Sequence, residues 1–383
     1  MSFNQQHHQK KQPFAGYAVR DECPIFRDNV SALFPALLRD PEYAVRIRES
    51  ITKSTMYQGQ QVPHIPADAP RSLPPSVHVV NFDSLSCAHM VMENHGDASP
   101  LVHNMASDRK AGGGVKYGAK AQEESLARRS TLYMQLDHRY RQTCGDHKEK
   151  VRDWYGRDGM HEEELSYNPG AIVVRDADND LMPRKNWFEV SFISSAAIRR
   201  PRCDASGNYM ADQRDSDLMR DKYKALLRLA WNRGHRNLVL SAWGSGAFRV
   251  PCQHMAEILA ELLFGDAEFA GVFNNVYISI IDPYLNTDNY RIYDAEVKRM
   301  KQVVVERSGG GGASSSSSSS SSSAPASSIP ASSSSSASAS SAPASSTEEI
   351  SSVAQQGDES AVRISKSQAR RQRARKLKAA LHI

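Results

Sequence analysis

The sequence predicts an α/β fold, because apolar runs and amphipathic stretches alternate along most of its 383 residues. The apolar runs predict strands at 77–82, 100–106, 171–175, 187–194, 237–242 and 272–281. Helical periodicity predicts helices at 84–92, 213–233, 251–264 and 287–305. Such alternation builds a mixed, mostly parallel sheet between two helical layers. We therefore expect a three-layer α/β/α sandwich.

The segment before the first strand differs from the rest. Apolar residues recur at helical intervals at Val30, Leu33, Leu37 and Leu38, which predicts a helical lead-in at 26–51. Prolines are frequent at 63–75. We expect a flexible amino terminus at 1–25, a helical amino-terminal extension at 26–75 and the main domain at 76–306.

The end of the chain is not built to fold. Residues 308–346 are almost wholly Gly, Ser, Ala and Pro, which cannot bury enough apolar surface, so 307–360 is expected to be a disordered linker. The tail at 361–383 has no acidic residue and eight basic ones: Arg363, Lys366, Arg370, Arg371, Arg373, Arg375, Lys376 and Lys378. Because the formal net charge is +5, the rest of the chain carries −3. Nucleic-acid binding is therefore expected of the tail, not of the main domain.

The cysteines and hydropathy indicate the compartment. The chain has 5 Cys in scattered positions and no C-x-x-C, so we expect neither a disulfide framework nor a cysteine zinc site. No apolar run approaches the ~20 residues that span a bilayer, and the first residues have no apolar core like that of a secretory signal. We expect an intracellular protein, cytoplasmic or nuclear, with no membrane partner.

The stretch GGGVKYGAKAQEE at 112–124 is the most informative about chemistry. Its glycines are Gly112, Gly113 and Gly114, which allow a tight turn whose N–H groups could cradle a phosphate. Helix-forming residues fill most of 118–137, so Glu123 and Glu124 fall near a helix start, about 100° apart around its axis. This pattern suggests cleavage of a substrate that carries a diphosphate. The alternatives are a mobile loop and two carboxylates that only complement the helix dipole.

A second loop follows the strand predicted at 237–242. It consists of Trp243, Gly244, Ser245, Gly246, Ala247 and Phe248, and Pro251 then opens a predicted helix. Unpaired N–H groups before a helix suit a second side of the diphosphate. The serine-hydrolase motif G-x-S-x-G needs Gly where Trp243 stands, so Ser245 is not read as a nucleophile.

The glycine triplet, a seven-residue spacer and QEE, within NMASDRKAGGGVKYGAKAQEESLARRSTLY, resemble the signature of microbial-type poly(ADP-ribose) glycohydrolases. The resemblance continues through 167–176, 188–197 and 238–251 and covers roughly residues 26–299. It implies a macrodomain-like catalytic domain that hydrolyses ribose–ribose O-glycosidic bonds of poly(ADP-ribose) and releases ADP-ribose, most simply from chain ends. It also implies that ADP-ribosylated proteins are partners and that no metal or other cofactor is needed.

The resemblance assigns roles to the QEE residues. Glu124 would be the general acid and base, Glu123 would hydrogen-bond the ribose hydroxyls, and Gln122 would help to position the pair. Such an acid and base are what cleavage of a glycosidic bond requires.

Three further assignments have alternatives. Phe248 would pack on ADP-ribose, or it could be a core phenylalanine. Asp83 could accept from the adenine amino group, or it could be a surface or helix-capping residue. Asn104 could contact the ribose, or it could satisfy local backbone groups.

Some positions depart from the family pattern. Lys110-Ala111 precede the triplet where Asn-Pro is frequent, Ser245 replaces a frequent Cys, and Ile198-Arg199 stand where Pro-Asn is common. These changes could alter affinity or substrate range.

Two acidic and histidine-containing groups invite a metal interpretation. They are the pair His254 and Glu257 and the run at 161–164, and neither has a recognisable third ligand. We expect solvated charged faces at both.

Two rival functions are weighed against hydrolysis. One is an ADP-ribose-binding macrodomain module with weak catalysis, which the intact Glu123-Glu124 disfavours and the changes at Lys110 and Arg199 weakly favour. The other is a nucleic-acid-binding protein that acts through its tail. We interpret the chain as a poly(ADP-ribose) glycohydrolase.

Overall fold

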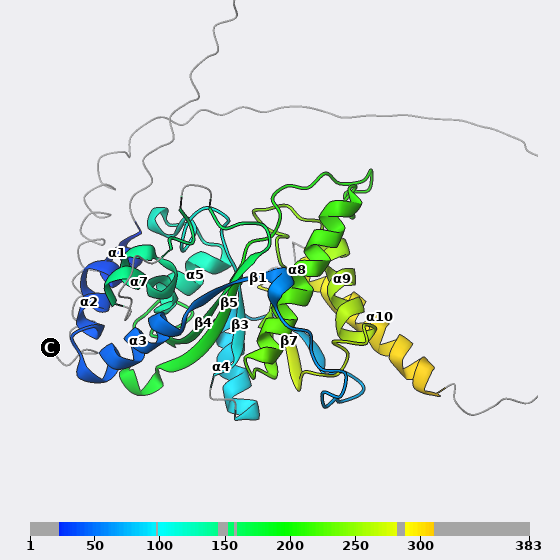
Figure 1. Ribbon diagram of the computed structural model, residues 1–383, viewed down its shortest axis with the longest axis horizontal. Helices are drawn as coiled ribbons and strands as arrows, with labels where there is room; N and C mark the ends of the chain where they lie inside the picture. Colours follow the sequence, from blue (N-terminus) through cyan, green and yellow to red (C-terminus); the bar gives the residue numbers. More distant parts are fainter. Residues whose placement is uncertain (1–22, 97–98, 145–151, 157–158, 282–287, 310–383) are drawn as a thin grey trace, which may run out of the picture. The chain divides into compact units, whose positions relative to one another are not determined.

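The structure is a computed structural model that describes residues 23–96, 99–144, 152–156, 159–281 and 288–309 (Figure 1). The expectations for residues 1–22, for most of the linker and for the basic tail lie outside the described residues. No helix in the described ranges is long and apolar enough to cross a membrane.

One mixed sheet has the strand order β1-β4-β5-β3-β6-β7-β2. Its strands are β1 (Thr55–Gln58), β2 (Val77–Val80), β3 (Leu101–Met105), β4 (Glu164–Val173), β5 (Phe188–Ser195), β6 (Asn237–Leu240) and β7 (Asn275–Ser279). Strands β5, β3, β6, β7 and β2 are parallel neighbours, whereas β4 runs antiparallel to β5 and to β1. The predicted mixed, mostly parallel sheet is confirmed.

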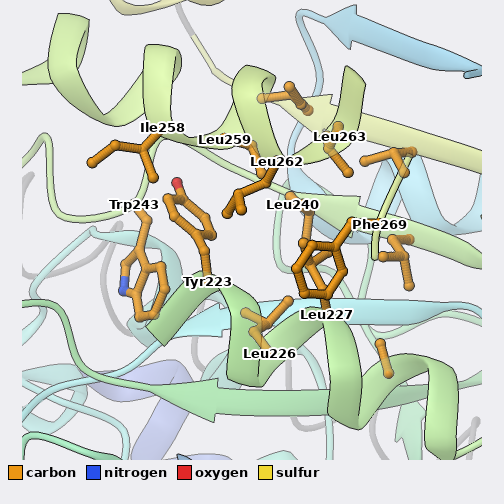
Figure 2. Packing of buried hydrophobic residues seen from close by; sticks show 14 of the residues in the cluster. Tyr223, Leu226, Leu227, Leu240, Trp243, Ile258, Leu259, Leu262, Leu263 and Phe269 are labelled. Carbon is orange, nitrogen blue, oxygen red and sulfur yellow. The ribbon is translucent and has the colours of Figure 1, made fainter. Parts of the chain in front are cut away.

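Helices cover both faces of this sheet (Figure 1). One layer contains α8 (Gln213–Asn232), α9 (Cys252–Phe264) and α10 (Asn289–Gly309), and the other contains α4 (Ser84–His95), α5 (Gln122–Arg129), α6 (Leu132–Leu136) and α7 (His138–Cys144). Alternation along β6 shows the two faces, because Leu238 and Leu240 pack with the first layer and Val239 with the second. Figure 2 shows the first core, where Tyr223, Leu240 and Trp243 pack together with leucines of α9. The predicted three-layer α/β/α sandwich is confirmed.

The amino-terminal segment is helical only in its first part. It contains α1 (Pro24–Asp28), a π-helical turn at Asn29–Leu33, α2 (Phe34–Leu37) and α3 (Pro41–Lys53). These helices share a core cluster with Tyr133 and Met134 of α6. These helices confirm the helical lead-in predicted at 26–51, and the chain then forms β1, which pairs with β4, so the extension expected at 26–75 is helical only as far as Lys53.

Two other boundaries differ from the expectation. The single helix expected at 118–137 breaks at Ser130, because this residue is extended and bridges to Val173 of β4. Strand β4 begins at Glu164 instead of 171, and a register shift between Asn168 and Ala171 accommodates Pro169 and Gly170. The end of β4 therefore lies beside the carboxyl end of the QEE helix α5.

Candidate active site

A cavity of about 350 Å³ lies at the carboxyl ends of the parallel strands, where ligands bind in such sheets. It is lined by the start of α5 and by the loops after β3, β5 and β6. Its lining includes Ser107, Arg109, Lys110, Gly113, Gly114, Gln122, Glu123, Glu124, Ala197, Arg199, Trp243, Gly244, Gly246, Ala247 and Phe248. The structure thus brings together the two loops that the sequence singled out.

Glu124 lies in the first turn of α5 and lines this cavity. The N–H of Gly114 donates to its Oε1 at 2.7 Å. Its other oxygen, Oε2, is buried and has no hydrogen-bond partner in the described part of the chain. One oxygen is therefore held in place, while the other has no partner in the described part of the protein.

Glu123 is more deeply held, with 3% of its surface exposed. Its Oε1 accepts from the N–H of Gly112 at 3.1 Å, and its Oε2 accepts from the N–H of Ser107 at 2.7 Å. Burial raises the pKa of Glu123 to about 8, with help from the neighbouring Glu124, while the hydrogen bonds from Ser107 and Gly112 oppose the rise. Glu123 therefore keeps its proton at neutral pH.

The glycine triplet supports these carboxylates. Gly112 and Gly113 have φ of +69° and +55°, and a Cβ on Gly113 would lie 2.4 Å from Glu124 Oε1 and 3.0 Å from Glu123 Oε2. The N–H of Gly113 donates to the carbonyl of Lys110 at 3.0 Å. All three N–H groups of the triplet thus donate within the protein, and contact of this loop with a diphosphate stays a prediction.

Gln122 and Asn104 hold the framework of the site. The Oε1 of Gln122 accepts from Met105 N at 2.8 Å, and its Nε2 donates to Ser84 Oγ and to the carbonyl of His103. Gln122 therefore ties α5 to β3 and α4, as a positioning residue would. Asn104 is fully buried and donates to Ser194 Oγ at 3.1 Å, which favours its local role over ribose contact.

The second loop has N–H groups without a hydrogen-bond partner in the described part of the protein, unlike the glycine triplet. It is closed by hydrogen bonds from Val250 N to Gly244 O and from Arg249 N to Gly246 O, both 3.0 Å. Within the described ranges, the N–H groups of Gly246, Ala247 and Phe248 donate to no residue. This loop can therefore still receive an anion.

Gly244 and Ser245 support the loop from behind. Gly244 has a φ of +76°, and a Cβ there would lie 2.5 Å from Val250 Cγ2. The N–H of Ser245 donates to Ala242 O, and its Oγ is buried away from the cavity lining. The other predicted members of this loop line the cavity, and Ser245 does not.

Phe248 is half-buried, lines the cavity and also packs against the edge of the first core cluster, so its contact with ADP-ribose stays a prediction. The guanidinium of Arg199 lies 4.1 Å from the centroid of its ring. The Nε of Arg199 also donates to Asp108 Oδ2 at 3.1 Å. The sequence pointed to Arg199 only as a departure from the family pattern and gave no sign of these contacts.

Asp83 lines a neighbouring cavity of about 660 Å³, which shares Met105, Ala121, Gln122, Ala242 and Gly246 with the first. Its Oδ1 accepts from Leu85 N and Ser86 N, both at 3.0 Å, and from Arg129 Nη1 at 2.5 Å. Asp83 therefore caps α4 and pairs with a buried arginine, as the capping alternative expected. Its contact with adenine stays a prediction.

Both groups with an apparent metal-binding pattern contain a side chain that forms an ion pair or a hydrogen bond within the protein. Residues 161–163 are exposed, as expected, whereas Glu164 is buried and pairs with Arg152 at 2.7 Å. His254 Nδ1 accepts from Met210 N at 3.1 Å. Among the described residues, no three His, Cys, Asp or Glu side chains lie close enough to hold a metal ion.

Comparisons with known proteins agree with this geometry. Residues 30–176 match the family model described as "Microbial-type PARG, catalytic domain", where PARG is poly(ADP-ribose) glycohydrolase. No curated protein sequence matches the chain.

Solved structures are similar over most of the chain. The PARG of Thermomonospora curvata is 27% identical, with a TM-score of 0.60 over 71% of this chain and 97% of that one. The same enzyme bound to the inhibitor ADP-HPD is 26% identical, with a TM-score of 0.57 over the same shares. The PARG of Deinococcus radiodurans in complex with ADP-ribose, 24% identical, has a TM-score of 0.51 over 69% and 99%, which shows the fold alone.

Proposed function

We propose that the chain carries a catalytic domain of the microbial-type poly(ADP-ribose) glycohydrolase family and that Glu124 performs its hydrolysis of ribose–ribose bonds. The observation that carries this assignment is the free Oε2 of Glu124, which belongs to a carboxylate fixed by Gly114 beside the buried Glu123. This arrangement supplies an acid with one reactive oxygen.

The reaction takes two steps on this residue. Glu124 first donates a proton to the leaving ribose oxygen as the bond to the anomeric carbon breaks and an oxocarbenium-like charge develops. Its carboxylate then accepts a proton from the water that attacks the same carbon. Each oxygen of Glu123 has a further lone pair, so Glu123 can also accept from a ribose hydroxyl and fix the sugar.

The released ADP-ribose would bind along the two connected cavities. Gly246, Ala247 and Phe248 line the first cavity with N–H groups that have no partner among the described residues, and these groups would donate to the diphosphate. The ring of Phe248 would pack against the same ligand. The adenosine end would extend past Gln122 and Gly246 into the 660 Å³ cavity, beside Asp83.

Product analysis tests this function most simply. The full chain is incubated with labelled poly(ADP-ribose), and the products are identified by mass spectrometry. Free ADP-ribose that appears from the start, with polymer ends shortened one unit at a time, is the expected result. Tight binding of ADP-ribose without turnover would instead identify a binding module.

Partners beyond the polymer depend on the tail at 361–383. We expect the chain to act on ADP-ribosylated proteins in the cytoplasm or nucleus, and the tail to bind polymer or nucleic acid through its charge. A chain that ends after residue 309 should keep its turnover of short oligomers. It should lose affinity for long polymer at low salt, and the loss should shrink as the salt is raised. Equal binding by both chains would refute recruitment by the tail.

A further inference from the structure

A third cavity, of about 340 Å³, adjoins the candidate active site on the side of Arg199. Arg109, Ala197 and Arg199 line both this cavity and the one that contains Glu124. Its other lining residues are Asp108, Met160, Glu162, Ala196, Ile198 and Lys222. No step of the hydrolysis described above uses these residues.

Arg199 forms the wall between the two cavities. One contact of its guanidinium is with the ring of Phe248, which belongs to the first cavity. Its other contact is the ion pair with Asp108, which belongs to the third. A substrate that reaches from one cavity into the other must pass this side chain.

Lys222 gives the third cavity a buried cation. It projects from α8 with 5% of its surface exposed, and its Nζ donates to the carbonyl of Glu162. Burial lowers the pKa of Lys222 to about 8, so this amine is still mostly protonated at pH 7. No carboxylate forms an ion pair with it among the described residues.

The charges that line this cavity favour an anion. Three cations, Arg109, Arg199 and Lys222, face two carboxylates. One of these carboxylates, Asp108, is already paired with Arg199 and lies 3.6 Å from Nε of Arg109, and the other, Glu162, is exposed. A flexible anion that entered could contact the remaining donors of the two arginines and of Lys222.

The chemistry of the polymer supplies such an anion. When the ribose–ribose bond lies at Glu124, one ADP-ribose unit extends past Gln122 into the 660 Å³ cavity. The leaving part of the polymer must then extend away from Glu124 in another direction, and its next unit carries a diphosphate. We propose that the cavity beyond Arg199 is a subsite for the diphosphate of the leaving part of the polymer. This inference rests on the proposed function.

Two substrates with the same ADP-ribosyl group test it. One is the ADP-ribose dimer, whose leaving part carries a diphosphate. The other is ADP-ribose with 4-nitrophenol on the anomeric carbon, whose leaving group has no phosphate. Lys222→Met should lower kcat/KM on the dimer by roughly tenfold, as loss of one hydrogen bond to a charged group would, and leave the nitrophenyl substrate within about twofold. Lys224→Met, on the same helix outside the cavity lining, is the control and should change neither.

A second variant covers the case in which Lys222→Met does not fold. Glu162→Gln removes an exposed negative charge from the cavity and keeps the backbone carbonyl that Lys222 contacts. It should raise kcat/KM on the dimer about twofold to threefold, whereas Glu306→Gln, on α10, should not. Equal effects on both substrates, or no effect of either cavity variant, would overturn the subsite. If the wild-type chain hydrolysed neither substrate, the proposed function itself would fail instead.

Discussion

The N–H of Gly114 donates a 2.7 Å hydrogen bond to Oε1 of Glu124. The third glycine of the triplet and the last residue of QEE are thus bonded to each other, and Gly112 holds Glu123 in the same way. The two halves of the motif form one support, in which glycine lets the backbone approach the carboxylates closely. The spacing between them therefore fits the support that the glycine N–H groups give to the two carboxylates.

The variant Gly113→Ala, compared with a control glycine, should show whether turnover depends on the close approach of the backbone to Glu124 or only on backbone strain. The new Cβ would lie 2.4 Å from Glu124 Oε1 and would displace the acid, so we expect turnover to fall about 10²-fold. Gly118→Ala is the matched control, because Gly118 also has a positive φ, +75°, but its Cβ would meet nothing within 4 Å. It should lose similar thermal stability and keep turnover within about threefold. Equal losses of turnover in the two variants would contradict the account.

The pH profile should report the proton held by Glu123. Because the pKa of Glu123 is raised to about 8, Glu123 keeps its proton below that pH and loses it above. We expect this proton to pass through Glu124 to the leaving oxygen, so kcat on polymer should fall about tenfold per pH unit above about pH 8. The nitrophenyl substrate is the control, because its leaving group departs without protonation and should lack this fall. A profile for polymer that stays flat to pH 10 would count against this role of the Glu123 proton.

Phe248→Ala should weaken ligand binding and leave the fold intact. The half-buried ring lies at the cavity rim, so its loss should cost about 1–2 kcal/mol of ADP-ribose binding with little change in Tm. Phe269→Ala is the contrast, because Phe269 is 1% exposed in the core shown in Figure 2. It should cost about 3–5 kcal/mol of stability. Calorimetric binding and thermal unfolding on the same samples would distinguish the variants, and a large drop in Tm for Phe248→Ala would make it a core residue.

The sequence predicted the sheet well because buried parallel strands are short apolar runs between amphipathic helices. It missed β1 because Thr55–Gln58 is a half-exposed edge strand of mixed polarity, without the alternation that would reveal it. It missed the break at Ser130 because the bridge to Val173 is a tertiary contact between residues of ordinary helix propensity.

The sequence predicted most of the residues that line the candidate site, but not the contacts that they make. The triplet indicated a backbone that must turn tightly, and Gly112 and Gly113 do so. A glycine in the sequence does not reveal which acceptor its N–H contacts. The hydrogen bonds from Gly112 and Gly114 to the two glutamates could therefore be seen only in the folded structure. Arg199 and Lys222 come from distant segments, and only the packing of α8 and the loop after β5 places them beside the cavity.

The most direct test of the central claim is Glu124→Gln, which keeps the shape of the side chain and its contact with Gly114 while removing the acid. Turnover of poly(ADP-ribose) and calorimetric affinity for ADP-ribose should be measured on the same preparation. We expect turnover to fall at least ~10²-fold while the Kd for ADP-ribose stays within about threefold of the wild-type value. Near-normal turnover by this variant would contradict the assignment of Glu124 as the general acid and base.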